Sequence, residues 1–513
     1  MITNASKRII ANFVQVLILG TIALTQTIPS SGSKQQSSAA ANPDDRISKV
    51  ENSLLPTPII VPSEPIKKLS LRAEMSKNLV PGLSVAVIDN YQIAWAKGYG
   101  VTDVRSQTPV TPDTLFCAGG ITKFVTAVAV LRLAQENKLD LDQDVNKYLT
   151  SWKAPSNQFT QKHPVTIREL LSHNSGIPRH RPSTLSPLPN LPDVLQLIKH
   201  DPSPERGQPL DVIFEPGTEF DYSSGAFLVL ELLLTDVQQK PFREIVQELV
   251  LDPVGMQHSS FAQPVTADPR PERASGHMLS SDGKAVQADV LAFPELAGSG
   301  LWTTPSDLAR LVINVQKSGQ PGSILSSASY STLVHSVVSN AALGVFVVGE
   351  NESRRFRVRT SDGTPSDTFT GWLVGYLNGG KGAVVLANSS GAFQVGFSLV
   401  RSVALEYNWR DYVPVRPPAK INVDVYKKYA GRYQLGDNVA TVSRSADGKS
   451  LLGQIGDSEK VPLYPTSQDS FFVTTELLYE ARIRFVVDKA GNVSGLVLEY
   501  PDRGESFTAP RIP

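Results

Sequence analysis

A lysine near the start of an apolar helical pattern is the residue whose type and position most directly suggest chemistry. The segment from Ile121 to Ala134 reads ITKFVTAVAVLRLA and carries charges only on Lys123 and Arg132. Such a pattern predicts a central, buried helix. Burial lowers the pKa of a lysine, which can then act as a general base near neutral pH. The alternative is a side chain that extends past the helix end into solvent.

The residue three positions before this lysine shares its helix face, and a serine there would be an activated nucleophile. The stretch FCAGGITKF places Gly120 at that position. Glycine has no side-chain oxygen, so the position cannot be acylated. The N-terminus of the helix still favours anions, which leaves binding available where acylation is not.

Other catalytic patterns are absent from the sequence. There is no Gly-x-Ser-x-Gly elbow, His-Glu-x-x-His pair or phosphate-binding loop, and the seven histidines show no ligand spacing. Cys117 is the only cysteine, lies in an apolar setting, and is expected to be an inert core residue. We therefore expect no metal and no cofactor.

Four further blocks accompany the helix in a fixed order. They read VTIRELLSHNSGIP (165–178), FEPGTEFDYSSGAFLVLELLL (214–234), KPFREIVQELVLDPVGMQHSSF (240–261) and AGSGLWTTPSDLARLV (297–312). Together with the helix at Lys123, they resemble the β-lactamase and penicillin-binding-protein superfamily, in the branch of class C β-lactamases, D-alanyl peptidases and esterases. The resemblance covers residues 79–390. It implies an α+β fold with an antiparallel sheet flanked by helices and an all-helical part.

The sequence departs from this family at the residues that carry its chemistry. Ser-x-x-Lys becomes Gly120 with Lys123, and Tyr-x-Asn becomes Tyr222 with Ser224. By resemblance, Lys123 and Tyr222 keep their proton-handling roles, and the N–H of Gly120 keeps its place in an oxyanion hole. Ser224 is either a displaced nucleophile or a serine that hydrogen-bonds the lysine and stabilises the fold.

The third family element is a histidine or lysine before a glycine on a strand, and no such residue is found here. The corresponding stretch, VRTSDGTPSDTFTGWL (358–373), offers the trio from Thr360 to Asp362, or a slightly later one, with Arg359 as the nearest cation. The LSHNSG stretch resembles a structural turn of the family. We expect its serines, Ser172 and Ser175, to be structural and His173 to pack rather than act as a base.

Length and charge limit the classes of partner. The chain has 513 residues, 41% of them hydrophobic, with 49 basic and 49 acidic residues. This size supports a large core and more than one domain. Zero net charge removes the usual electrostatic argument for nucleic acid or an anionic membrane surface. The partner that the resemblance implies is a small molecule or peptide, such as one derived from peptidoglycan.

The N-terminal residues are typical of an export signal. Lys7 and Arg8 precede a stretch without charge, so residues 1–33 are predicted to be a signal peptide and the protein to be periplasmic or extracellular. The alternative is a signal anchor that keeps the protein at a membrane. Small polar residues at 34–46 predict a flexible leader.

Strand-like and helical patterns predict two domains. Strand-like runs occur at both ends of residues 47–412 with helical patterns between them, which predicts one antiparallel sheet assembled from distant segments. A proline-rich linker follows at 413–420. Short alternating strands at 421–513 predict a small, barrel-like all-β domain.

Three hypotheses about function follow. The first is a family member that has lost acyl transfer and binds cell-wall peptides or related amides. The second is an active hydrolase of esterase, β-lactamase or D-alanyl peptidase type, which uses Ser224 or a substrate-assisted water with Lys123 and Tyr222. The third is a protein whose relevant surface is the C-terminal β domain.

Overall fold

The structure is a computed structural model that describes residues 42–179, 192–199, 210–262, 273–280, 284–288, 294–360, 368–474, 480–501 and 505–513. The predicted signal peptide and most of the predicted leader lie outside these residues. Residues 43–46, predicted as leader, instead form the first turn of α2 (Pro43–Glu51). The side chain of Asn42 caps this helix by accepting from the N–H of Asp44, and Pro43 suits its first position.

The chain forms two compact units. The larger one, Ser70–Tyr412, is built around an antiparallel sheet whose strands come from both ends of the unit. The strand order is β2-β1-β10-β9-β8-β7. Its strands are β1 (Gly82–Asp89), β2 (Gln92–Gly100), β7 (Phe346–Val348), β8 (Arg355–Arg359), β9 (Thr370–Tyr376) and β10 (Gly382–Ala387). In the centre, Val85 of β1 lies opposite Val385 of β10. The predicted α+β arrangement, with one sheet assembled from distant segments, is confirmed.

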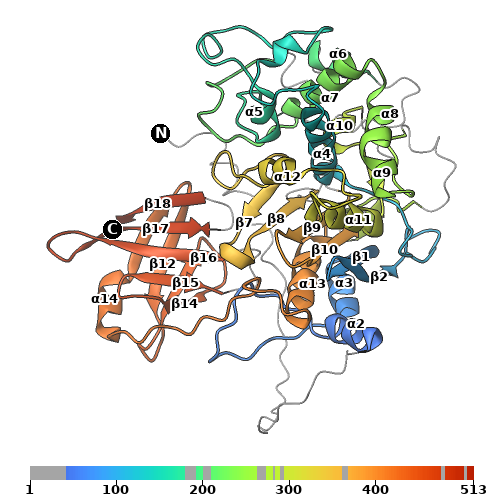
Figure 1. Cartoon of the computed structure of the whole chain (residues 1–513). Coiled ribbons are helices and arrows are strands. Elements are labelled where there is room, and N and C mark those ends of the chain that lie inside the picture. Colours follow the sequence, from blue (N-terminus) through green and yellow to red (C-terminus); the bar gives the residue numbers. More distant parts are fainter. Residues whose placement is uncertain are drawn as a thin grey trace. The chain divides into compact units, whose positions relative to one another are not determined.

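Helices cover both faces of this sheet (Figure 1). On one face lie α4 (Thr122–Gln135) and α11 (Pro305–Gln316); on the other lie α3 (Leu71–Lys77) and α13 (Ala392–Glu406). Two residues of β9 three positions apart show the alternation of faces, because Gly375 faces Val312 of α11 whereas Trp372 packs on Gly396 of α13. The reading of Ile121 to Ala134 as a buried helix is confirmed, with α4 buried around nearly its whole circumference.

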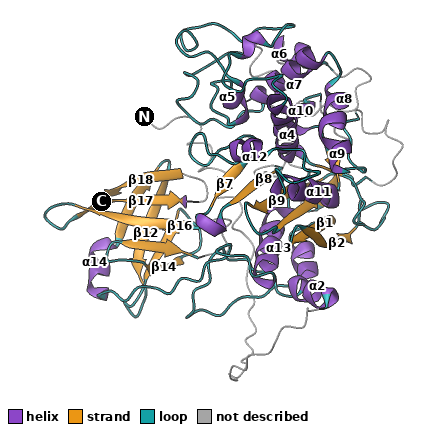
Figure 2. Ribbon diagram, viewed as in Figure 1, coloured by secondary structure: helices purple, strands orange, loops and turns teal. Residues whose placement is uncertain are grey.

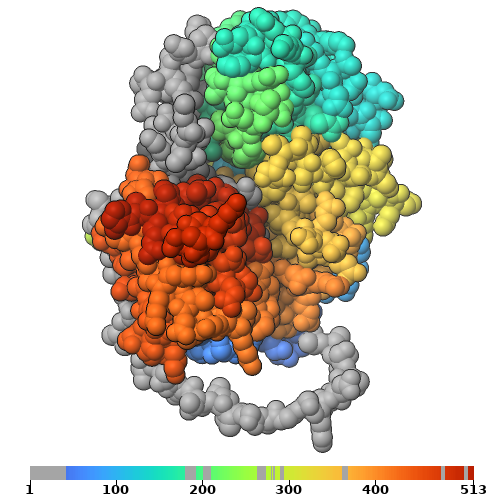
Figure 3. All heavy atoms as spheres, turned by 90° about the vertical axis from the view of Figure 1, so that its left-hand side faces the viewer, coloured from blue at the N-terminus to red at the C-terminus, as the bar shows by residue number. Residues whose placement is uncertain are grey.

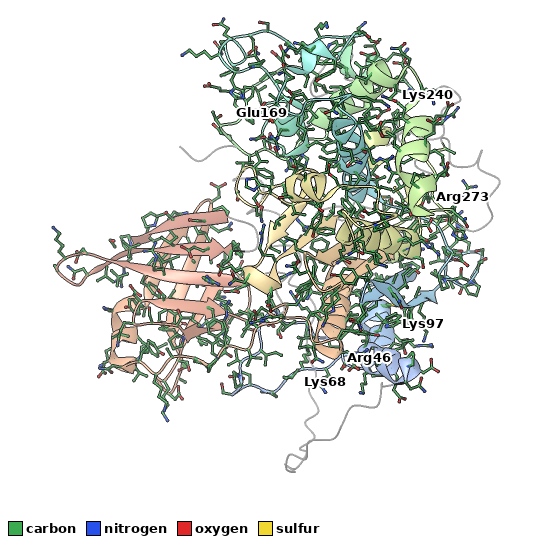
Figure 4. All side chains as sticks on the ribbon, viewed as in Figure 1. Arg46, Lys68, Lys97, Glu169, Lys240 and Arg273 are labelled. Atoms are coloured by element: carbon green, nitrogen blue, oxygen red, sulfur yellow. The ribbon has the colours of Figure 1, made fainter. Side chains whose placement is uncertain are left out.

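An all-helical part adjoins α4 (Figure 2). Its helices are α5 (Ile167–Leu171), α6 (Val194–Lys199), α7 (Gly225–Gln238), α8 (Phe242–Val246), α9 (Asp252–Val254) and α10 (Leu296–Ser299), with α12 (Ser327–Leu333) nearby. A capping box between Thr166 and Glu169 starts α5; Glu169 is labelled in this part of the molecule in Figure 4. Two short ladders complete the unit: β3 (Phe116–Cys117) with β6 (Trp302–Thr303), and β4 (His277–Leu279) with β5 (Ala285–Gln287).

The smaller unit comprises the chain up to Leu69 and the chain from Val413 onwards. It contains a closed eight-stranded barrel, which confirms the predicted all-β domain; its atoms appear in orange and red in Figure 3. The strands are β11 (Gly431–Leu435), β12 (Asn438–Arg444), β13 (Leu451–Ile455), β14 (Val461–Pro465), β15 (Ser470–Val473), β16 (Ala481–Val487), β17 (Val493–Tyr500) and β18 (Glu505–Ile512), preceded by α14 (Tyr426–Tyr429).

Aromatic rings fill the barrel. Tyr429 stacks on Phe485 with centroids 4.2 Å apart, and the Tyr433 hydroxyl donates to the carbonyl of Tyr429. Ile59, from the N-terminal segment of the same unit, packs against Phe472. No helix among the described residues is long and apolar enough to span a bilayer.

Candidate active site

Lys123 is buried in the first turn of α4, with 3% of its surface exposed. Its Nζ donates to the carbonyl of Gly298 at 2.9 Å and lies 5.3 Å from the ring centroid of Tyr222. Burial lowers the pKa of Lys123 to about 7, an effect that Glu295 opposes and Arg179 reinforces. The prediction of a buried lysine is confirmed, and the alternative of a side chain extended into solvent is wrong.

The segment that carries the acceptor for Lys123, the carbonyl of Gly298, is held in place by the buried carboxyl group of Glu231. The Oε2 atom of Glu231, on α7, accepts from the N–H of Ala297 at 2.9 Å, and the hydroxyl of Thr126 donates to the Ala297 carbonyl at 2.8 Å. Burial raises the pKa of Glu231 to about 8. Residue Ala297 of α10 is therefore fixed from both sides, and the next residue, Gly298, presents its carbonyl to Lys123.

Tyr222 belongs to an aromatic group beside Lys123. Its ring lies 4.4 Å from that of His173 and 6.5 Å from that of Phe346, and the guanidinium of Arg179 is 5.6 Å from its centroid. The Nδ1 atom of His173 accepts from the N–H of Ser223 at 3.1 Å, and burial lowers the pKa of this imidazole to about 3. His173 is therefore neutral at physiological pH and holds the loop that carries Tyr222, as expected of a packing residue.

Gly120, which by resemblance takes the place of the nucleophile, lies close to Tyr222 and to the residues that end β8. A Cβ atom built at this position would lie 3.1 Å from the hydroxyl oxygen of Tyr222, but also 2.7 Å from the carbonyl of Arg359 and 3.0 Å from that of Thr360. The N–H of Gly120 donates to this Thr360 carbonyl at 3.1 Å. The donor that resemblance assigns to an oxyanion hole is therefore already engaged by the chain itself.

The end of β8 explains this contact. Thr360 follows β8, its N–H donates to Gly371, and its hydroxyl donates to the carbonyl of Ala118 at 2.9 Å. A Cβ atom at Gly119, whose φ is +48°, would lie 2.5 Å from the Cγ2 of Thr360. Two adjacent glycines thus allow the strand end to close on the helix start. In the sequence, the only signal of this contact is the pair Gly119-Gly120.

Arg359 and Thr360 belong to the stretch that by resemblance contains the third family element. The guanidinium of Arg359 lies 5.8 Å from the ring of Phe393 on α13, which covers the opposite face of the sheet from α4. Thr360, rather than this cation, therefore adjoins Gly120. The other two members of the trio, Ser361 and Asp362, lie outside the described residues.

Ser224 occupies the N-cap position of α7 and is half-buried. Its carbonyl accepts from the N–H of Phe227 at 3.1 Å. The neighbouring Ser223 is structural, since its hydroxyl donates to Pro178 and accepts from the N–H of Ala226. The role of Ser224 as a nucleophile stays a prediction.

Cys117 lies on β3, close to the site but buried, with its Sγ atom 3.8 Å from the carbonyl of Ser299. Burial raises the pKa of this thiol to about 12, so it is not a thiolate at neutral pH. Within the described ranges, no group of three or more His, Cys, Asp or Glu side chains is arranged to hold a metal ion.

The fold, an α+β domain with an antiparallel sheet, and the buried Lys123 beside Tyr222 are the features by which the family can be assigned. The Beta-lactamase family model matches residues 70–402, and the chain belongs to this family. In the solved structures, the octameric penicillin-binding protein homologue from Pyrococcus abyssi is similar in fold, with a TM-score of 0.57 and 22% identity over 86% of this chain and 98% of that one. FmtA from Staphylococcus aureus has a TM-score of 0.50 and 20% identity over 69% and 91% of the two chains.

Two relatives from Staphylococcus aureus are similar in sequence. Protein flp of strain N315 is 30% identical over 236 residues, which are 45% of this chain and 43% of that protein. A teichoic acid D-alanine hydrolase is 26% identical over 238 residues, 46% of this chain and 54% of that protein. The chain thus spans about half the length of the curated relatives it matches.

Several residues of the site were not found from the sequence. The carbonyl of Gly298 accepts from Lys123, and Glu231 holds the preceding residue, Ala297. The negative charge of Glu295 opposes the lowering of the Lys123 pKa, and Arg179 flanks the ring of Tyr222. Each comes from a segment remote from α4 in sequence. Only the pairing of a buried lysine with an acceptor could have been anticipated, because buried polar groups require partners.

Proposed function

We propose that this protein is a non-acylating member of the Beta-lactamase family that binds cell-wall peptides or related amides without cleaving them. The observation that carries the proposal is the closure at Gly120. Residue 120 carries no nucleophilic oxygen, and its N–H, which by resemblance would stabilise a tetrahedral oxyanion, donates to Thr360 instead. Loss of the serine and engagement of this donor remove both the covalent step and part of its stabilisation.

The remaining site supports binding. The guanidinium of Arg179 and the amine of Lys123 lie 5.6 Å and 5.3 Å from the centroid of the half-buried ring of Tyr222, and the exposed guanidinium favours a ligand with a carboxylate or a polarised carbonyl. The name of the teichoic acid D-alanine hydrolase places that relative on a cell-envelope polymer, and we extend this class of ligand to the present chain. Export, as the pattern of residues 1–33 indicates, belongs to the same proposal.

The test is intact-mass spectrometry after incubation with a penicillin, a cephalosporin and an activated ester. We expect no added mass on protein that circular dichroism shows to be folded. A serine penicillin-binding protein treated in parallel is the positive control. A stable adduct that peptide mapping assigns to any serine of this chain would overturn the proposal.

One observation favours a second candidate, an active hydrolase with a displaced nucleophile. The pKa of Lys123 is lowered to about 7, which suits a general base, and Tyr222 adjoins it. If Ser224 were the nucleophile, Ser224→Ala would abolish ester turnover, and Lys123→Ala would lower it steeply. Unchanged turnover in Ser224→Ala would exclude this serine, and unchanged turnover in Lys123→Ala would exclude the shared base.

A further inference from the structure

We propose that Arg179 binds the carboxylate of the ligand, while Phe220 and Phe346 contact an apolar or aromatic group next to that carboxylate. The ligand class is a small carboxylate with a hydrophobic substituent, such as the C-terminal residue of a peptide. The inference rests on the proposed function only in taking the surroundings of Tyr222 as the binding site.

The strand end that borders Gly120 supplies no cation for such a ligand. Thr360 directs a carbonyl, which is an acceptor, at the N–H of Gly120, and Arg359 lies over Phe393 instead. A carboxylate would be repelled by that carbonyl rather than held by it. The cation must therefore come from another segment of the chain.

Arg179 comes from such a segment. Its side chain is 53% exposed, and its guanidinium lies 5.6 Å from the centroid of Tyr222. Arg179 forms an ion pair with Asp221, with 3.9 Å between its Nε and the Oδ1 atom. A guanidinium has five N–H donors on three nitrogens, so Arg179 can donate to a ligand carboxylate from its exposed side and keep this ion pair.

Lys123 adds positive charge to the site, but it is not the group that would bind the ligand carboxylate. It is almost fully buried, donates to Gly298, and has Glu295 near enough to raise its pKa. Its charge is thus met from inside the protein. Arg179, on the exposed side of Tyr222, is placed to meet a ligand from outside.

The apolar contact is provided by an aromatic group that is exposed at one end. Phe220 is 41% exposed, and its ring lies 6.0 Å from that of Phe346 and 6.2 Å from that of His173, both edge-on. His173 contacts both of these rings and Tyr222 contacts that of Phe346. Because these contacts already restrict the two phenylalanines, little side-chain entropy would be lost on binding. An exposed phenyl ring beside an arginine suits a ligand that is apolar next to its carboxylate.

The experiment measures the equilibrium affinity of three non-hydrolysable probes by calorimetry or NMR titration: 3-phenylpropanoate, 3-phenylpropanamide and propanoate. We expect the protein to prefer the phenyl carboxylate over its amide by about tenfold or more, as charge-assisted hydrogen bonds allow. It should prefer the phenyl carboxylate over propanoate as well.

Variants separate the two contacts. Arg179→Gln should reduce the carboxylate-to-amide preference to near unity with little change in amide binding, and Arg179→Lys should restore part of it. Phe220→Ala should weaken both phenyl probes alike and keep the preference for the carboxylate. The matched control is Arg72→Gln on α3, where the side chain is exposed and should change nothing.

Equal affinity for carboxylate and amide, a preference that survives in Arg179→Gln, or no binding of any probe to folded protein would each overturn the inference. These outcomes are distinct from those of the mass-spectrometric test. An adduct with penicillin would remove the non-acylating function but leave the carboxylate preference standing. Absence of that preference would leave the lack of acylation standing.

Discussion

The N–H of Gly120 and the carbonyl of Thr360 are joined by a hydrogen bond of 3.1 Å, so the start of α4 and the end of β8 are in direct backbone contact. This contact depends on the absence of a side chain at position 120, where a Cβ atom would lie 2.7 Å from the carbonyl of Arg359. The glycine is therefore a requirement of the present packing, whatever its relation to the family's nucleophile.

Restoring a side chain at position 120 should cost stability. We expect Gly120→Ala to lower the free energy of unfolding by about 1–3 kcal/mol, because the strand backbone must move to make room. Gly298→Ala is the matched control, since a Cβ atom there meets nothing closer than 3.6 Å. Urea denaturation of both variants measures the difference, and equal stability would mean that the contact is freely adjustable.

Gly120→Ser should also fail to form an acyl-enzyme. The new side chain would displace the strand end, and by resemblance the other two family elements remain altered, with Ser224 in place of an asparagine and no histidine or lysine in the stretch that follows β8. Mass spectrometry with a penicillin measures this directly. Rapid, stoichiometric acylation of Gly120→Ser would show that the serine alone had been lost.

Lys123 should make stability rise with pH above neutrality. Its pKa is about 7 when folded and 10.5 when unfolded, so the unfolded state binds more protons between these values. Stability from this group therefore increases by at most about 1.4 kcal/mol per pH unit from pH 7 upward. The difference between wild type and Lys123→Met, measured by urea denaturation at pH 7, 8 and 9, should show this rise; the exposed Lys77→Met is the control.

Glu231 should act in the opposite direction. Its folded pKa of about 8 exceeds the unfolded value of 4.5, so stability from this group is lost as pH rises from about 5 to 8. Glu231→Gln keeps an oxygen for the N–H of Ala297 and should gain stability over wild type by about 3–4 kcal/mol between pH 5 and pH 8, at up to about 1.4 kcal/mol per pH unit. The exposed Glu244→Gln should show no such gain. A constant difference across this range would contradict the buried, neutral carboxyl.

Cys117 should be unreactive in the folded protein. Its thiol is buried, and its pKa is raised to about 12, so iodoacetamide at pH 8 should add no mass until the protein is unfolded in urea. Labelling at equal rates in folded and unfolded protein would show that β3 opens readily.

The sequence predicted the parts of the fold in which local pattern and burial agree. The helix at Lys123 was predictable because apolar residues surround a single lysine, and the barrel because its strands alternate regularly between turns. The helical turn at Pro43 was missed because the stretch before it is rich in small and polar residues, and its first turn was assigned with that stretch rather than by the capping residue Asn42. Composition over a window hides a cap that depends on one side chain.

The site was predictable only where its residues lie close in sequence. Gly120 and Lys123 share one helix turn, so their relation follows from spacing. The contact between Gly120 and Thr360 joins residues 240 positions apart and depends on the register of β8 with β9. Arg179 and Phe220 are likewise brought to one site by contacts with Tyr222 and His173, respectively. No local sequence pattern encodes these contacts.

The pairing of β1 with β10 has a consequence for how this protein is made. Val85 and Val385 lie opposite each other in the centre of the sheet, 300 positions apart in the chain. β1 can pair with β2 as soon as both are made, but nearly the whole unit must leave the ribosome before β1 can pair with β10. Until then this edge of β1 must be kept from pairing with other chains. We infer that this unit folds late and as a whole, and that its nascent chain depends on chaperones more than the locally paired barrel does.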